Sequence, residues 1–198
     1  NYKINNLAVS DKNCSFIFNV AKNPTVSSLN KFSKNLNKTW PGYKEAHCTV
    51  IKKIKVKGIT LEKYCLDNDI KRINYLHIDT QGSDLKVLKG LKKKISIVDE
   101  GVMEAALNNK LSLYQKNHTI RDAKNFLHKK NLIISKIDSI DENIKNEKNI
   151  YFNKKNIKRN IKLNKKYNLR YFNRIISNKV KFKDRLIDNV KKYLFFLD

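Results

Sequence analysis

The strongest constraint on the fold is a strand–turn–helix pattern in the first half of the chain. Ile73–Ile78 is a mostly apolar run of six residues, which is typical of a strand buried on both faces. Asp79 ends the run, Gly82 permits a tight turn, and Ser83 stands at the expected N-cap of a helix. Three leucines, Leu85, Leu88 and Leu91, follow at three-residue steps, and Gly90 is the expected stop signal of the helix. A buried strand that feeds a capped helix is half of a parallel β-α-β unit.

Before this pattern, apolar runs and alternating residues predict three strands, at residues 7–9, 15–20 and 50–56. The polar stretch 21–47 lacks clear periodicity and is expected to be a functional loop, a lid or disorder. Thr60 is expected to cap a short helix over residues 61–68.

After the pattern, three more strands are predicted, at residues 102–107, 132–137 and 149–152. Thr119 is expected to begin a helix, with Asp122 completing a capping box, and residues 138–148 read as a polar turn. Strands and helices alternate and then a hairpin closes the sheet, so the sequence predicts a doubly wound α/β fold that ends in an antiparallel strand pair.

The charge of the chain is strongly positive, with 43 basic and 18 acidic residues and a formal net charge of +25. Such a balance attracts nucleic acid or an anionic membrane surface. An AT-rich coding sequence would produce the same positive charge. Lys, Asn and Ile all have AT-rich codons, and all three are abundant here. Proteins that read bases depend on arginine forks and stacked aromatic residues, whereas lysine dominates here. We therefore favour the compositional explanation for residues 1–150.

Residues 154–198 form a separate basic segment, without glycine or proline. Their apolar residues fall at helical spacing, which predicts two basic amphipathic helices. Such helices bind an anionic surface or a partner, or they pack on the parent domain or on a second copy of the chain.

The 198 residues are enough for one domain of ordinary size, here residues 1–153. No apolar run approaches the roughly 18 residues of a membrane-spanning helix, and the first residues lack the apolar core of a signal peptide. We therefore expect a cytoplasmic protein. Cys14, Cys48 and Cys65 are widely spaced, so we expect small buried side chains rather than a metal site or disulfides.

Asp79 is the first candidate for chemistry. In open parallel sheets, ligands bind at the carboxyl ends of the strands, and Asp79 follows such an end. A carboxylate there accepts hydrogen bonds from an amine or hydroxyl and favours a positive charge. The other interpretation of an aspartate before a turn is a helix cap.

The segment from Lys71 to Gly90 resembles the signature of FkbM-type methyltransferases, which use S-adenosyl-L-methionine (SAM). That signature is a hydrophobic strand followed by D-x-[EQ]-G-x-[ED]-x-x-V-L-x-G. Further segments resemble the family in the same order: residues 7–11, 26–29, 59–62, 104, 113–114 and 147–152. The resemblance covers about residues 4–155.

The resemblance implies a Rossmann-like class I methyltransferase sheet, of which strands three to seven are present, and SAM as the cofactor. The acceptor would be a hydroxyl of a glycan or another small molecule. Ser10 and Asp11 would lie near the adenine, and Asp79 and Gln81 would also contact the cofactor. Asp79 or Glu104 would take the proton from the acceptor. His47 and His118 are alternative bases that we expect to be ordinary loop residues.

One part of the family pattern is missing. The glycine-rich turn that follows strand one in this fold does not occur, because the glycines stand far apart. We therefore expect a fragment of a longer protein that binds SAM poorly, in which the first segment has no neighbouring strand and Ile73–Ile78 has an unpaired edge. The alternative functions are a basic binding module for RNA or an anionic membrane, and a catalytically dead remnant.

Overall fold

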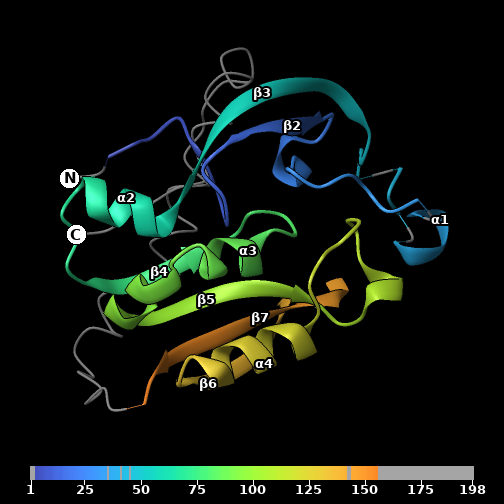
Figure 1. The fold of residues 1–198 in the computed structure, drawn as a ribbon. Helices are drawn as coiled ribbons and strands as arrows, with labels where there is room; N and C mark the ends of the chain where they lie inside the picture. The colour runs from blue at the N-terminus through green and yellow to red at the C-terminus, as the bar shows by residue number, and fades with distance from the viewer. Residues whose placement is uncertain (1–2, 35, 41, 45, 142–143, 156–198) are drawn as a thin grey trace.

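The computed structural model describes residues 3–155 apart from residues 35, 41, 45, 142 and 143. The predicted basic helices of residues 154–198 therefore lie, from residue 156 onward, outside the described residues. The fold is mixed α/β, with two sheets joined by one apolar core (Figure 1).

The larger sheet has the strand order β4-β5-β7-β6 and contains the predicted strand–turn–helix pattern. Its strands are β4 (Ile73–Ile78), β5 (Val98–Ala106), β6 (Leu132–Asp141) and β7 (Ile144–Lys154). β4 and β5 are parallel, while β7 runs antiparallel to both β5 and β6. This order confirms the predicted parallel pair followed by an antiparallel pair, and it leaves β4 at the edge, as expected.

The hairpin between β6 and β7 is longer than predicted. The strands extend to Asp141 and from Ile144, so the prediction of a polar turn over residues 138–148 is wrong. Ladder hydrogen bonds use only backbone groups and therefore continue where apolar alternation stops. Lys148 adds a side-chain link, donating from Nζ to Ser139 Oγ at 2.7 Å.

The smaller sheet has the order β1-β3-β2 and consists of β1 (Ala8–Ser10), β2 (Ser15–Ala21) and β3 (Val50–Thr60). β2 pairs antiparallel with β3, and β1 pairs parallel with it from Ala8↔Gly58 to Ser10↔Thr60. The prediction that the first segment has no neighbouring strand is therefore wrong. Its neighbour is the last part of β3, which runs beyond the alternating pattern visible in the sequence.

Helix α3 (Asp84–Lys89) lies between the two sheets (Figure 1). Val9 and Ile59 of the smaller sheet share one core with Leu85 and Leu88 of this helix. Gly90 ends α3, as predicted, but at an ordinary right-handed conformation (φ −64°, ψ −15°). A Cβ atom there would stand 2.3 Å from the carbonyl oxygen of Ser10 in β1. Glycine is therefore needed for close approach rather than for a left-handed turn.

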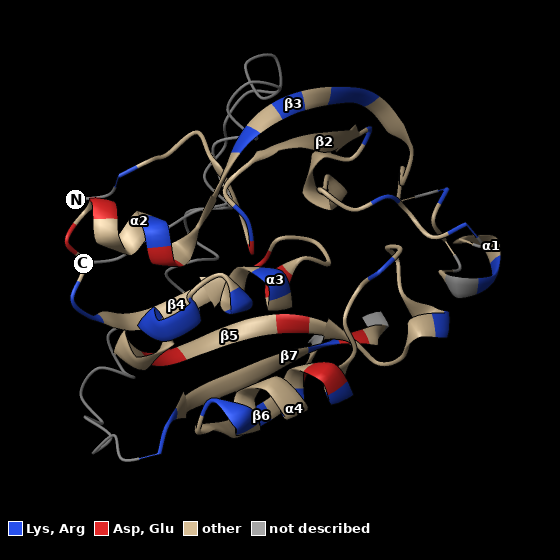
Figure 2. Ribbon diagram, in the orientation of Figure 1, with Lys and Arg blue, Asp and Glu red and all other residues tan. Residues whose placement is uncertain are grey.

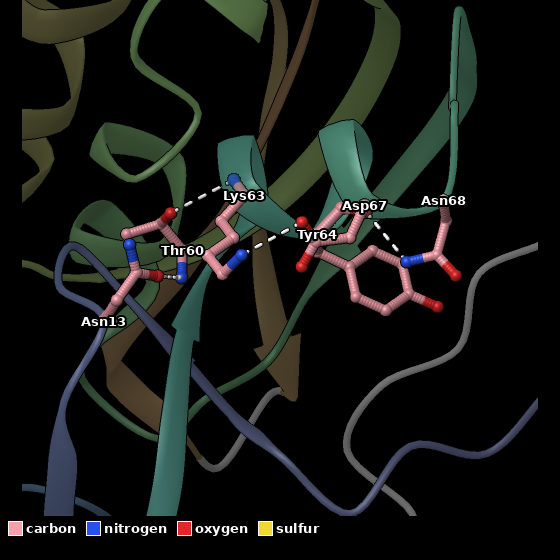
Figure 3. Close-up of polar contacts among 6 residues, drawn as sticks. All are labelled: Asn13, Thr60, Lys63, Tyr64, Asp67 and Asn68. Atoms are coloured by element: carbon pink, nitrogen blue, oxygen red, sulfur yellow. Dashed lines mark hydrogen bonds and ion pairs between the residues drawn. The ribbon is translucent and has the colours of Figure 1, made fainter.

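Two further helices are capped as the sequence predicts. At the start of α2 (Leu61–Asp67), Thr60 Oγ1 accepts a hydrogen bond from the Lys63 amide at 3.2 Å (Figure 3). The Thr60 amide in turn donates to Asn13 Oδ1 at 2.8 Å, which ties the helix start to the turn between β1 and β2 (Figure 3). At the start of α4 (Ile120–Lys129), Thr119 and Asp122 form the predicted capping box.

The described part of the polar stretch 21–47 is packed rather than free. It contains η1 (Pro24–Val26) and α1 (Leu36–Thr39), and it covers a second apolar cluster built on Cys48, Leu113 and Tyr114. The rings of Phe32 and Tyr114 stack with centroids 5.6 Å apart. Two short helical segments, η2 (Lys92–Ile97) and η3 (Asn109–Leu111), are the other helical elements of the described residues.

Among the cysteines, Cys48 and Cys65 are buried, as expected, and burial raises the pKa of both thiols. Cys14 is exposed. The expectation of a buried side chain is wrong there because Cys14 lies in the turn between β1 and β2 rather than within either strand.

Candidate functional site

The turn after β4 is held by a chain of polar contacts. Asp79 Oδ1 accepts a hydrogen bond from Gln81 Nε2 at 2.7 Å. The Tyr114 hydroxyl lies 2.9 Å from both Gln81 Oε1 and the Val26 carbonyl oxygen, so two acceptors compete for its proton. Gln81 and Gly82 both have positive φ angles (52° and 88°), which confirms the tight turn predicted at Gly82. The Asp79 carboxylate is thereby oriented from outside its own strand.

The loop that contains Ser27 and Ser28 supports the same turn. Ser28 Oγ donates to the Gln81 carbonyl at 2.6 Å, and Asn30 Nδ2 donates to the Gly82 carbonyl at 2.8 Å. Asn30 also donates to Ser83 Oγ at 3.0 Å. Ser83 occupies the N-cap position but its side chain does not cap α3, so the predicted cap is wrong. The nearby amide of Asn30 binds the hydroxyl that would otherwise have accepted from the helix.

Asp84 joins the ends of β4 and β5. Its Oδ1 accepts from the amide and hydroxyl of Thr80 at 2.9 and 2.6 Å, and its Oδ2 accepts from the Glu104 amide at 2.8 Å. The side chain is fully buried, and burial raises its pKa to about 7 although these donors favour the ionised form. In the sequence Asp84 appears as an acidic residue in the first turn of a helix and at the [ED] position of the FkbM-type signature.

Glu104 and Glu147 stand on adjacent strands beside Asp79. In the ladder, Glu104 of β5 is opposite Asn149, and Glu147 of β7 is opposite Ala106. Residues two apart on a strand share a face, so both glutamates point to one side of the sheet. Burial is the main cause that raises the pKa of Glu104 to about 9 and of Glu147 to about 7, and the negative charges of Asp79 and Asp84 add to it.

Within the described part of the chain, these four carboxyl groups, Asp79, Asp84, Glu104 and Glu147, form no ion pair with a basic side chain. We call them the acidic rim. Glu147 was missed as a site residue because the sequence placed it in a turn. The only signal that could have found it is its position at the start of the closing strand of the family resemblance.

His118 is buried, and its Nε2 lies 2.8 Å from the Glu104 carbonyl oxygen. Burial lowers the pKa of His118 to about 4, so the ring is neutral and Nε2 carries the proton that the carbonyl accepts. The ring supports the end of β5 rather than presenting Nε2 as a base. His47 has a left-handed backbone (φ 52°) in the loop before Cys48.

Ser10 and Asp11 lie apart from the acidic rim. Ser10 is buried against Gly90 at the carboxyl end of α3, and its hydroxyl donates to Asp11 Oδ1 at 3.2 Å. Asp79 and Gln81 precede the amino end of that helix, and its six residues span roughly 9 Å. The structure thus brings together Asp79, Gln81 and Glu104, and it places Ser10 and Asp11 elsewhere.

A cavity of about 70 Å³ borders the turn after β4 and is lined by Thr80, Gln81, Ser27 and residues 6–9 of the β1 segment. Pockets for drug-sized ligands are typically about 300–1,000 Å³. The rim fits the cationic groups of SAM by charge, because its carboxyl groups have no basic partner among the described residues. Asp79, Asp84, Glu104 and Glu147 are not among the residues that line this cavity, so its volume does not measure the space at the rim.

Basic side chains are spread over the described strands, helices and loops rather than gathered on one element (Figure 2). The described residues include no group of three side chains suited to hold a metal ion. They also include no helix that is both long enough and apolar enough to cross a membrane.

Comparison with known proteins identifies the family. The family model described as the methyltransferase FkbM domain matches residues 1–134, which include β1 to β5, the turn at Asp79 and the candidate residue Glu104. No curated protein matches the chain, and no solved structure does. The match covers 134 of the 198 residues, and the chain therefore belongs to the FkbM methyltransferase family.

Proposed function

We propose that the protein is a SAM-dependent O-methyltransferase that acts on a hydroxyl group of a glycan or another small molecule. The observation that carries this proposal is the acidic rim, where Asp79 and Glu104 stand together at the carboxyl ends of parallel strands, the edge at which such sheets bind ligands. Family membership supports methyl transfer as the reaction and SAM as the methyl donor.

SAM supplies an electrophilic methyl group on a positively charged sulfur. The chain has to hold that charge, align the acceptor hydroxyl and remove its proton. Asp79 is oriented by Gln81 and is suited to hold a cationic or hydroxyl group. Glu104 is suited to accept the proton, because a carboxylate whose pKa is raised is a stronger base once it is ionised. Gln81, Ser10 and Asp11 are proposed cofactor contacts on the family pattern alone.

The alternative, a binding module for RNA or an anionic membrane, depends on residues 154–198, most of which lie outside the described residues. Family membership favours the enzyme. Binding of an anionic surface by this segment stays a prediction, as do a cytoplasmic location and the division of the chain near residue 153.

The test is transfer of a labelled methyl group from SAM to a panel of glycans and hydroxylated small molecules by the complete gene product. Glu104→Gln and Asp79→Asn keep the side-chain shape but remove the charge, and each should lower kcat by roughly 100-fold or more. Glu100→Gln, four residues earlier on β5, is the matched control and should retain activity. Wild-type turnover in both rim variants would remove these residues from the mechanism.

A further inference from the structure

The larger sheet packs against helices α3 and α4 through one of its faces. Ile78, Met103 and Ile150 form a row across β4, β5 and β7. These residues share one apolar core with Leu88 of α3 and Leu127 of α4. Since neighbouring residues of a strand point to opposite faces, a second set of side chains points away from these two helices.

Two rows of side chains cross that opposite face on all four strands. The first row is Tyr75, Glu100, Asn153 and Ile133, and the second row is His77, Val102, Tyr151 and Lys136. We call these residues the second face. Lys136 Nζ lies 5.9 Å from the centre of the Tyr151 ring, which agrees with their places side by side in one row. None of these residues belongs to either apolar cluster of the described residues.

The second face combines exposed apolar surface with polar groups that lack partners. Tyr75 and Ile133, on the two edge strands, are large hydrophobic side chains and are 44% and 45% exposed. The side-chain oxygen of Asn153 is buried without a hydrogen-bond donor among the described residues, although buried acceptors normally have one. The Glu100 carboxylate forms no ion pair with a described residue. The face therefore suits a partner that is apolar along one stripe and carries basic side chains beside it.

Residues 156–198, which lie outside the described residues, have this character in their sequence. They follow β7, which ends at Lys154, next to Asn153 of the second face. They contain thirteen Lys and Arg residues and three Asp residues. Near their end, apolar side chains recur at four-residue steps, which predicts one stripe along a helix. The members of this stripe are Phe182, Leu186, Val190 and Leu194.

The length of the connection allows the stripe to reach the second face. Residues 156–181 separate the end of the described chain from the stripe, and an extended chain spans up to roughly 3.3 Å per residue. A segment tethered in this way binds at a high effective concentration, which favours it over a separate molecule with the same chemistry.

We propose that the helix predicted over residues 182–197 packs on the second face, with its apolar stripe over Val102 and Tyr151. Basic side chains beside the stripe then stand near the Glu100 carboxylate and the Asn153 oxygen. The occupant is thus a segment of the same chain rather than a membrane, an RNA or a second copy. This inference goes beyond the proposed function and does not depend on it.

Photo-crosslinking in the complete gene product tests this packing. A benzophenone amino acid at position 75 or 133 should crosslink within one chain to peptides from residues 182–197. The same amino acid at position 17, an exposed residue of β2 in the smaller sheet, is the control and should not crosslink to them. Crosslinks between two chains, crosslinks only to other segments, no crosslinks, or an equal yield from position 17 would each overturn the proposal.

Variants of the stripe give a second test. Val190→Asp places a charge in the apolar contact and should lower the crosslinking yield from position 75 roughly ten-fold or more. Lys192→Ala, on the opposite side of the predicted helix, should leave the yield unchanged. Without any crosslinker, Val190→Asp should also shift the methyl NMR signals of Val102 and leave those of Val87 in α3 in place. Val102 signals that do not move would overturn the packing, whatever the protein methylates.

Discussion

The contact between β1 and α3 joins the two sheets. The substitution Gly90→Ala adds one methyl group at this contact and therefore tests how closely the two elements pack. The backbone of Gly90 is right-handed, so alanine fits its conformation without strain. On that ground alone, Gly90→Ala should stabilise the protein by about 0.4–1 kcal/mol, because it narrows the conformations of the unfolded chain. The packing around Gly90 predicts instead that Gly90→Ala destabilises the protein.

A Cβ atom at position 90 would stand 2.3 Å from the Ser10 carbonyl oxygen and 3.1 Å from the Val87 carbonyl oxygen. The first distance is roughly 1 Å short of ordinary van der Waals contact. Both neighbours are backbone atoms, so no side chain can swing aside, and β1 has to move away from α3. Overpacking of this kind costs about 1–3 kcal/mol. We therefore expect Gly90→Ala to lower the free energy of unfolding by that amount.

Urea denaturation followed by circular dichroism measures the change in the free energy of unfolding. Lys89→Ala, at the exposed preceding position, is the control and should change stability by no more than about 0.5 kcal/mol. A Gly90→Ala variant as stable as the wild type, or more stable, would refute the packing of β1 against the end of α3.

Two further changes test the supports of the site by the same denaturation measurement. Thr119→Ala removes the capping box of α4 and should cost about 1 kcal/mol; no loss relative to Arg121→Ala would contradict that cap. His118→Gln keeps a donor for the Glu104 carbonyl but removes the titrating ring. Because burial lowers the pKa of His118 to about 4 from 6.5, its contribution is fully present above pH 6.5 and is lost as pH falls to about 4, a change of roughly 3 kcal/mol. Between pH 6.5 and about 4, the free energy of unfolding should fall less in the variant than in the wild type. Parallel curves of the free energy of unfolding against pH would contradict the lowered pKa of His118.

The local features of the fold were predictable because they are coded within a few residues. Ile73–Ile78, the turn at Gly82 and the capping box at Thr119 all appear where apolar periodicity and capping residues indicate. The same reasoning located Asp79 at a strand end, where open parallel sheets bind ligands. Glu104 was assigned to this edge only through the family resemblance, because the local pattern placed it inside the predicted strand 102–107.

The partners of those segments were decided only by the tertiary structure. β1 pairs with a strand 50 residues further along the chain, and Ser83 is bound by Asn30 from a distant loop instead of capping its own helix. Glu147 joins the acidic rim because the β6–β7 hairpin continues through residues that look like a turn. Backbone amides and polar side chains form hydrogen bonds with whichever donors and acceptors the rest of the fold brings near. Sequence periodicity determines which face of an element is buried, whereas the assembled fold determines what it is buried against.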